Sequence, residues 1–157
     1  MANQTERADQ EMDGDRRHAA ADALVELGRS PHYRDRADAG HGLARFAELQ
    51  EAQGPLLDLV LDPHDTFVTR VTAEALLQRT DRIGLAIVAS ALAVTDESHG
   101  EWIHTAIHDV FGIFSNKRDS AVQVCEELLQ DPDDRVARGA RQLREALTEI
   151  DPVLRPA

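Results

Sequence analysis

The chain has 157 residues, of which 42% are hydrophobic but only 4% are aromatic. Its formal net charge is −12, from 29 acidic and 17 basic residues, so its summed field repels phosphate backbones and anionic membrane surfaces. These totals argue against nucleic acid and membranes as partners. They favour a basic protein, a cation or simple solubility.

The apolar content is mostly Ala, Leu and Val, which suit close helix packing better than strand pairing. We therefore expect a single all-α domain, large enough to bury a core without covalent staples. Cys125 is the only cysteine, so neither an internal disulfide nor a cysteine zinc cluster can form. Cys125 lies in an apolar helical run, which indicates a buried small hydrophobe.

At the N-terminus, residues 1–13 carry several acids and no apolar core. They match neither a signal peptide nor a transit peptide, and we predict a flexible polar tail. No later segment approaches the 18 or so apolar residues that span a bilayer. With a lone cysteine, this pattern predicts a cytoplasmic protein.

Four predicted helix starts follow the tail. Ser30-Pro31, Asp62-Pro63 and Asp131-Pro132 each place an N-cap acceptor before a proline at the first helical position. At the remaining start, Ser98 and Glu101 form a capping box. The starts are about 32 to 36 residues apart, which leaves room for two helices in each interval and indicates a repeat architecture.

Within these intervals we predict breaks at Gln53-Gly54-Pro55, at QRTDRIG (78–84) and at SNKRDS (115–120). Residues 82–94 are apolar all round, as expected of a central helix buried on several sides. The last helix instead has one apolar face. Sustained alternation is missing throughout, so we predict no strands.

Three segments give the chain its resemblance to HEAT-like repeat proteins, in the group that includes the short bacterial HEAT-like repeats. They are ADALVELGRSPHYRDRADAGHGLARF, LLDLVLDPHDTFVTRVTAEALL and LLQDPDDRVARGARQL. The resemblance covers residues 14–150 and leaves 151–157 as a C-terminal tail. It implies an α-solenoid of seven to eight antiparallel helices in three to four pairs, whose usual role is to present a curved surface to another macromolecule. The 96–101 junction departs from the pattern because it lacks the proline.

Other HEAT-like families have distinct requirements. A di-iron hydroxylase family uses several His-Glu pairs, but here only His108-Asp109 approximates one, which excludes that activity. A group that recognises damaged DNA needs a basic face, which does not fit an acidic chain. A group that handles bilin pigments stays open.

One segment combines candidate metal ligands with the only tryptophan. Glu101, His104 and His108 follow each other at steps of three and four, so one helical face could present them to a divalent metal. A polar helix face is the favoured interpretation, and we expect no resident metal or cofactor. Trp102 is either a binding anchor or, as we favour, a partly buried residue at the end of the core.

Two charged strips complete the candidates. An acidic strip of Asp119, Glu126, Glu127 and Asp131 is predicted on the helix expected to line the inner curve, and a basic ridge repeats every third residue along the last helix. We expect partner contacts from Asp119, Gln123, Glu126, Glu127, Trp102, Arg138 and Arg141. For the ridge of Arg135, Arg138, Arg141 and Arg144, the favoured interpretation is ion pairing with neighbouring acids.

The sequence thus predicts a non-catalytic protein-binding module, acting as an adaptor, regulator or assembly factor through its concave face. A more specific alternative is an inhibitor or immunity protein that masks a basic partner. The competing class is a metal- or cofactor-handling enzyme centred on Glu101, His104 and His108. Oligomeric state and partner identity stay open.

Overall fold

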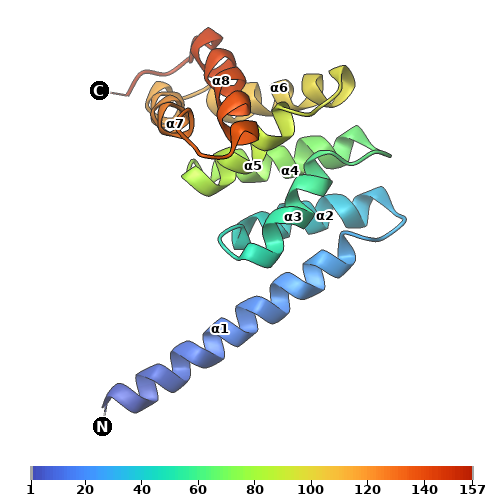
Figure 1. Cartoon of the computed structure of the whole chain (residues 1–157), viewed down its shortest axis with the longest axis vertical. Helices are drawn as coiled ribbons and strands as arrows, with labels where there is room; N and C mark the ends of the chain where they lie inside the picture. Colours follow the sequence, from blue (N-terminus) through green and yellow to red (C-terminus); the bar gives the residue numbers. More distant parts are fainter. Residues whose placement is uncertain (1, 157) are drawn as a thin grey trace.

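A computed structural model describes residues 2–156, which are all-helical apart from connecting turns and one isolated β-bridge, as the composition predicted (Figure 1). The elements are α1 (Ala2–Leu27), α2 (Tyr33–Leu43), the 3₁₀ helix η1 (Ala44–Phe46), α3 (Gln50–Val60), α4 (Thr66–Gln78), α5 (Arg82–Leu92), α6 (Glu97–Phe111), α7 (Ser115–Leu128) and α8 (Asp134–Glu149). In the described part of the chain, no helix is long and apolar enough to cross a bilayer.

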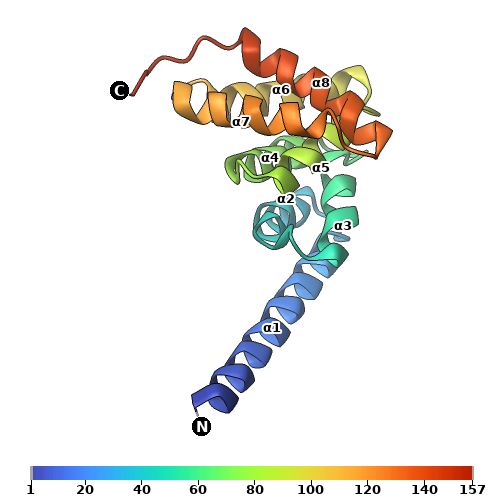
Figure 2. The same ribbon diagram turned by 60° about the vertical axis from the view of Figure 1, so that its left-hand side comes forward.

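The helices stack in two layers. Packing of α2 on α4 and of α4 on α6 makes the first layer, and packing of α3 on α5 and of α5 on α8 makes the second. If successive helices alternated strictly between the two layers, α8 would lie beside α6. Instead, α8 packs mainly on α5 and α7. Along the stack, α1 lies at one end and the α6–α8 group at the other (Figures 1 and 2).

Glycines allow the closest helix crossings. A Cβ at Gly139 of α8 would lie 1.7 Å from the carbonyl oxygen of Ala89 in α5, so a side chain there would collide with backbone. In the first layer, a Cβ at Gly40 of α2 would lie 2.0 Å from Oγ1 of Thr72 in α4. These two glycines set how closely each layer packs.

As predicted for residues 82–94, α5 is central. It contacts α3, α4, α7 and α8, and Arg82 is its only exposed residue. Leu85, Val88 and Ala89 are fully buried. Cys125 is also buried, and desolvation raises the pKa of its thiol to about 12, so the predicted role as a small hydrophobe fits its environment.

The repeated proline turns are present, but the helices begin two to three residues later than predicted. Asp62, Asp131 and Ser30 do not cap a helix directly. Each side-chain oxygen accepts the backbone N–H two residues on, across the proline, at 3.0, 2.9 and 3.1 Å. Such turns redirect the chain before the helix starts.

Aspartates that follow these turns cap two of the helices. Asp65 accepts the N–H of Phe67 at 2.8 Å, and Asp133 accepts the N–H of Arg135 at 2.9 Å. The predicted Ser98–Glu101 capping box is wrong, because Asp96 caps α6 by accepting the N–H of His99 at 2.8 Å. An aspartate carboxylate is a strong cap, and its use here places the helix start two residues earlier.

Of the three predicted breaks, one is confirmed. Residues 79–81 separate α4 from α5, with Thr80 at a positive φ of 54°. The Gln53-Gly54-Pro55 break is wrong because α3 continues through Pro55. The carbonyl of exposed Glu51 is the one that loses its amide partner, and water can replace that bond. The third break was predicted at residues 115–120, but these residues form the first turns of α7 and the chain turns just before them.

The predicted N-terminal tail is helical, and the predicted C-terminal tail forms backbone hydrogen bonds with the α6–α7 turn. Residues 2–13 continue α1 without interruption, because they are mostly good helix formers and contain no proline. Their side chains from residue 3 onward lie almost entirely in solvent, and this part of α1 projects away from the stack (Figure 2). At the other end, the N–H of Leu154 donates to the carbonyl of Ile113 at 2.7 Å, and the N–H of Ser115 donates to Leu154 at 2.9 Å.

Candidate functional site

The acidic strip predicted on α7 is solvent-facing. Asp119, Gln123, Glu126 and Glu127 are all exposed, whereas the opposite face of α7 is buried. Asp119 accepts a hydrogen bond from Arg118 at 2.7 Å. Among residues 2–156, neither Glu126 nor Glu127 has an ion-pair partner, so both carboxylates remain available.

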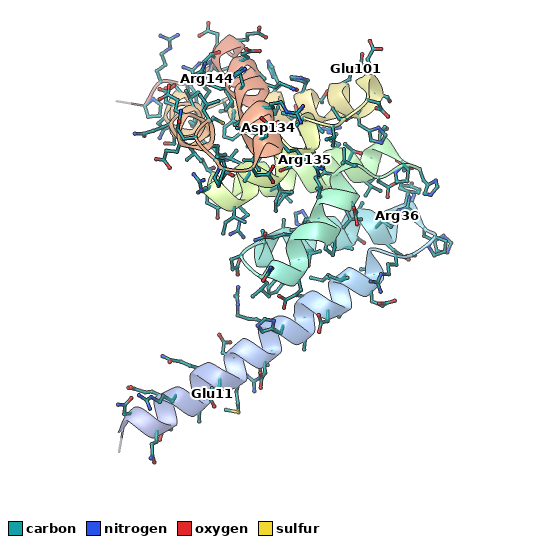
Figure 3. The ribbon with its side chains drawn as sticks, viewed as in Figure 1. Glu11, Arg36, Glu101, Asp134, Arg135 and Arg144 are labelled. Atoms are coloured by element: carbon teal, nitrogen blue, oxygen red, sulfur yellow. The ribbon has the colours of Figure 1, made fainter. Side chains whose placement is uncertain are left out.

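The arginine ridge of α8 winds around the helix. Arg135 and Arg144 are nine residues apart, which puts them on opposite sides of a helix with 3.6 residues per turn (Figure 3). Arg138 pairs with Asp134 at 2.8 Å, as the ion-pair interpretation expects for one of the four. Arg141 is exposed.

On α6, the candidate metal ligands share a face but do not converge. Glu101, His104 and His108 line a shallow depression of about 480 Å³ together with Thr105 and Asp109. Asp109 is held by Arg70 of α4 at 2.9 Å. Across the described residues, no three His, Cys, Asp or Glu side chains are close enough to hold a metal ion.

A buried ion pair lies where α2 and α4 begin. Arg36 of α2 contacts Asp62 through two parallel bonds, Nε to Oδ2 at 2.6 Å and Nη2 to Oδ1 at 3.1 Å. Nη1 of Arg36 also donates to the carbonyls of Ser30 and Pro31, at 3.1 Å each. The ion pair therefore ties the α1–α2 turn to the α3–α4 turn.

Burial opposes the ionisation of Asp62, but its hydrogen bonds outweigh burial. Arg36 and the backbone N–H groups of His64 and Asp65 hold the pKa of Asp62 below its ordinary value. Asp62 raises the pKa of Arg36 in turn. Both groups stay charged, which is how a buried pair with complete hydrogen bonding persists.

His99 extends this network to α6. Its Nε2 lies 2.7 Å from the carbonyl oxygen of Asp62, and its Nδ1 lies 2.7 Å from Oδ1 of Asp96. Both atoms opposite the ring are acceptors, so both ring nitrogens donate only when the imidazole is protonated. The hydrogen bond to the Asp62 backbone contributes most to raising the pKa of His99.

These contacts place the first turns of α2, α4 and α6 along one edge of the stack, where Arg36 and Glu101 lie on the same side of the molecule (Figure 3). Aromatic residues mark this edge: Tyr33 is the first residue of α2, Phe67 the second of α4 and Trp102 the sixth of α6. All three are exposed, and we call them the aromatic edge.

Tyr33 and Phe67 contact each other edge to face. Their ring centroids are 5.9 Å apart with an interplanar angle of 83°. The rings line a depression of about 740 Å³ with Arg34, Asp38 and Asp65. Nε of Arg34 donates to the Tyr33 hydroxyl at 3.1 Å, and the guanidinium carbon lies 5.7 Å from the Tyr33 ring centroid.

Sequence reasoning found Trp102 but missed Tyr33 and Phe67. Trp102 is 38% exposed, so its ring is accessible. The signal for the other two was present, because an aromatic residue follows each Pro-His turn, in SPHY and DPHDTF. A large ring in the first turn of a capped helix, among polar neighbours, has no core to enter.

A second apolar surface lies where the α6–α7 turn meets the C-terminal segment. Ile113 and Phe114 from the α6–α7 turn and Val153 and Leu154 from the C-terminal segment are all exposed. A parallel bridge joins Phe114 to Leu154.

No protein-family model matches the sequence, and no curated protein matches it. Among solved structures, the chain is similar to an engineered protein from the Northeast Structural Genomics Consortium, at 22% identity and a TM-score of 0.35. The match covers 82% of this chain and 62% of the engineered protein, so this chain spans less than two thirds of its length.

Proposed function

We propose that this chain is a non-catalytic protein-binding module, an adaptor, regulator or assembly factor of HEAT-like repeat type, that contacts its partner through the aromatic edge. One observation carries the proposal. The chain has six aromatic residues, and Tyr33, Phe67, Trp102 and Phe114 are exposed, three of them on consecutive helices of one layer. Exposed aromatic side chains are the residues that most often dominate binding energy at protein interfaces.

Hydrogen bonds join the starts of α2, α4 and α6 where the aromatic edge lies. Arg36, Asp62 and His99 connect the starts of the three helices, so the rings project from fixed backbone. A preorganised surface loses less entropy on binding than a mobile one. The polar residues around the rings, among them Asp38 and Glu101, provide the solvated rim that interfaces usually have.

This proposal moves the expected contact surface from α7 to the first layer. The α7 residues Glu126 and Glu127 offer charge but no apolar anchor, and rim charges mainly affect association rate. A cytoplasmic location and a basic partner remain part of the proposal, consistent with the net charge of −12.

Affinity capture from native lysate tests the proposal. We would compare wild type, Tyr33→Ser with Phe67→Ser, and a matched control, Ile113→Ser with Phe114→Ser, which removes similar apolar area from the other surface. A charge-reversed Glu126→Lys, Glu127→Lys variant tests α7 in parallel. We expect a partner that wild type and the Ile113/Phe114 and α7 variants retain and the Tyr33/Phe67 variant loses. Identical capture by all four, or loss only from the control or the α7 variant, would overturn the proposal.

A further inference from the structure

We infer that the depression between Tyr33 and Phe67 binds an arginine or lysine side chain on a basic segment of a partner protein. This inference rests on the proposed function and adds the chemistry of the contact. The depression combines two aromatic rings with two carboxylates, Asp38 and Asp65, and holds about 740 Å³. That volume accommodates one long side chain and part of its backbone.

The rings supply the first attraction. An aromatic face carries partial negative charge and attracts a cation within about 6 Å of its centroid. The Arg34 guanidinium already lies within this range, at 5.7 Å from the Tyr33 centroid. An apolar ligand alone would not require carboxylates in the same wall.

The carboxylates supply the second attraction. Asp38 is exposed and has no ion-pair or hydrogen-bond partner among the described side chains. Asp65 uses Oδ1 to accept the Phe67 N–H at 2.8 Å, and its Oδ2 has no partner within residues 2–156. With Arg34 at +1 and the two aspartates at −2, the lining carries a net charge of −1.

The whole molecule favours the same ligand. A net charge of −12 raises the encounter rate with basic segments and repels acidic ones. Arg34 competes for the Tyr33 ring from within the chain, so a partner cation must share or displace that contact. Removal of Arg34 should therefore strengthen binding, which a purely structural role for Arg34 does not predict.

The chain offers a clean reporter, because Tyr33 is its only tyrosine. Protein made with ring-¹³C tyrosine gives NMR signals from this position alone. We would titrate the full chain with the peptide Gly-Arg-Gly-Arg-Gly, with the same peptide carrying citrulline, the neutral isostere of arginine, and with a glutamate peptide.

We expect saturable shifts of the Tyr33 signals with the arginine peptide, roughly tenfold weaker binding of the citrulline peptide, and no shift with the glutamate peptide. Phe67→Ala and Asp38→Asn should each weaken binding of the arginine peptide by about three- to tenfold, and Arg34→Gln should tighten it. Circular dichroism of each variant checks that the fold is kept.

Equal binding of the arginine and citrulline peptides would overturn the inference, as would no shift with any peptide or unchanged affinity in Asp38→Asn. The proposed function fails separately. If lysate capture depends on Tyr33 and Phe67 while the Tyr33 signals show no preference for a cation, the aromatic edge still binds a partner, and only the cationic contact is wrong.

Discussion

The α3–α4 turn and the α7–α8 turn are written almost alike, as Asp-Pro-His-Asp and Asp-Pro-Asp-Asp, yet they have different environments. In both turns, the first aspartate accepts the N–H two residues on. The fourth residue, Asp65, then caps α4, whereas the third residue of the other turn, Asp133, caps α8. The side chain of Asp62 is only 4% exposed and pairs with buried Arg36. The side chain of Asp131 is 18% exposed and pairs with Arg82, which is 49% exposed.

The comparison separates local from tertiary causes. The aspartate and the proline produce the turn in both places, because their effects act within a few residues. Burial depends on the neighbouring helices. Arg36 of α2 lies against the α3–α4 turn, whereas the α7–α8 turn lies in the α6–α8 group at the end of the stack (Figure 1). The same four-residue signal therefore anchors a network in one place and only a surface ion pair in the other.

The largest expected effect is at the buried pair. Arg36→Ala leaves the Asp62 carboxylate buried without its counter-ion, and we expect a loss of roughly 3–5 kcal/mol in the free energy of unfolding. Urea unfolding measures this loss. A change below about 1 kcal/mol would show that the two turns are energetically equivalent.

The packing of α8, which follows the α7–α8 turn, depends on a glycine. Gly139→Ala places a Cβ against the Ala89 carbonyl, which is backbone and cannot move aside, so we expect a loss of about 3 kcal/mol. Gly14→Ala in α1 is the control, because no atom lies within 4 Å of the added Cβ. Equal midpoints for Gly139→Ala and wild type in thermal unfolding would contradict the close α5–α8 crossing.

The α3–α4 turn also contacts a titratable ring, that of His99. This ring faces the carbonyl of Asp62 and the carboxylate of Asp96, and Arg36 lies on the far side of Asp62. The pKa of His99 is raised in the folded state, so its stabilisation is complete below the unfolded pKa of about 6.5 and is lost as pH rises through the folded pKa. We expect the urea midpoint of wild type to fall as pH rises above about 6.5.

His99→Gln removes this titration and is the matched control, so its midpoint should change less over the same range. Parallel pH profiles for the two proteins would show that His99 is not protonated in the fold. On the acid side, Asp62 and Asp96 have lowered pKa values, so their stabilisation is present above about pH 4 and is lost as pH falls through their folded values.

The smallest expected effect is at the α7–α8 turn. Arg82→Ala removes the partner of Asp131 at 2.7 Å, but both side chains reach solvent, so we expect a loss of no more than about 1 kcal/mol. Added salt should reduce the difference between Arg82→Ala and wild type and leave that of Arg36→Ala largely unchanged. A loss at Arg82 as large as at Arg36 would remove the contrast between the turns.

Much of the fold was predictable because it depends on short-range chemistry. Composition and periodicity identified an all-α chain, the apolar run of 82–94 identified the central helix, and the proline turns located three helix starts to within a few residues. The break at Pro55 was wrong because a missing amide costs little where the opposing carbonyl reaches water. The position of α8 depends on the fit of Gly139 against Ala89, which periodicity does not encode.

The candidate site was less predictable for a related reason. Charge strips on α7 and α8 are visible in the sequence, but whether Tyr33 and Phe67 face solvent or core depends on which helix covers the first turn of α2 and α4. Their edge-to-face contact joins residues 34 positions apart, and it exists only because the two helices stack in register. Trp102 was identified because it is unique, without any indication that it belonged to a series.

Site-specific photo-crosslinking tests the central claim most directly. Benzoylphenylalanine would replace Phe67 on the aromatic edge, Gln123 on α7 or Val153 on the C-terminal surface, and each protein would be irradiated in native lysate. The account predicts a discrete adduct from position 67 that excess unlabelled wild type competes away, and no such adduct from position 123 or 153. A competed adduct from position 123 or 153 with none from position 67 would place the partner elsewhere and contradict the account.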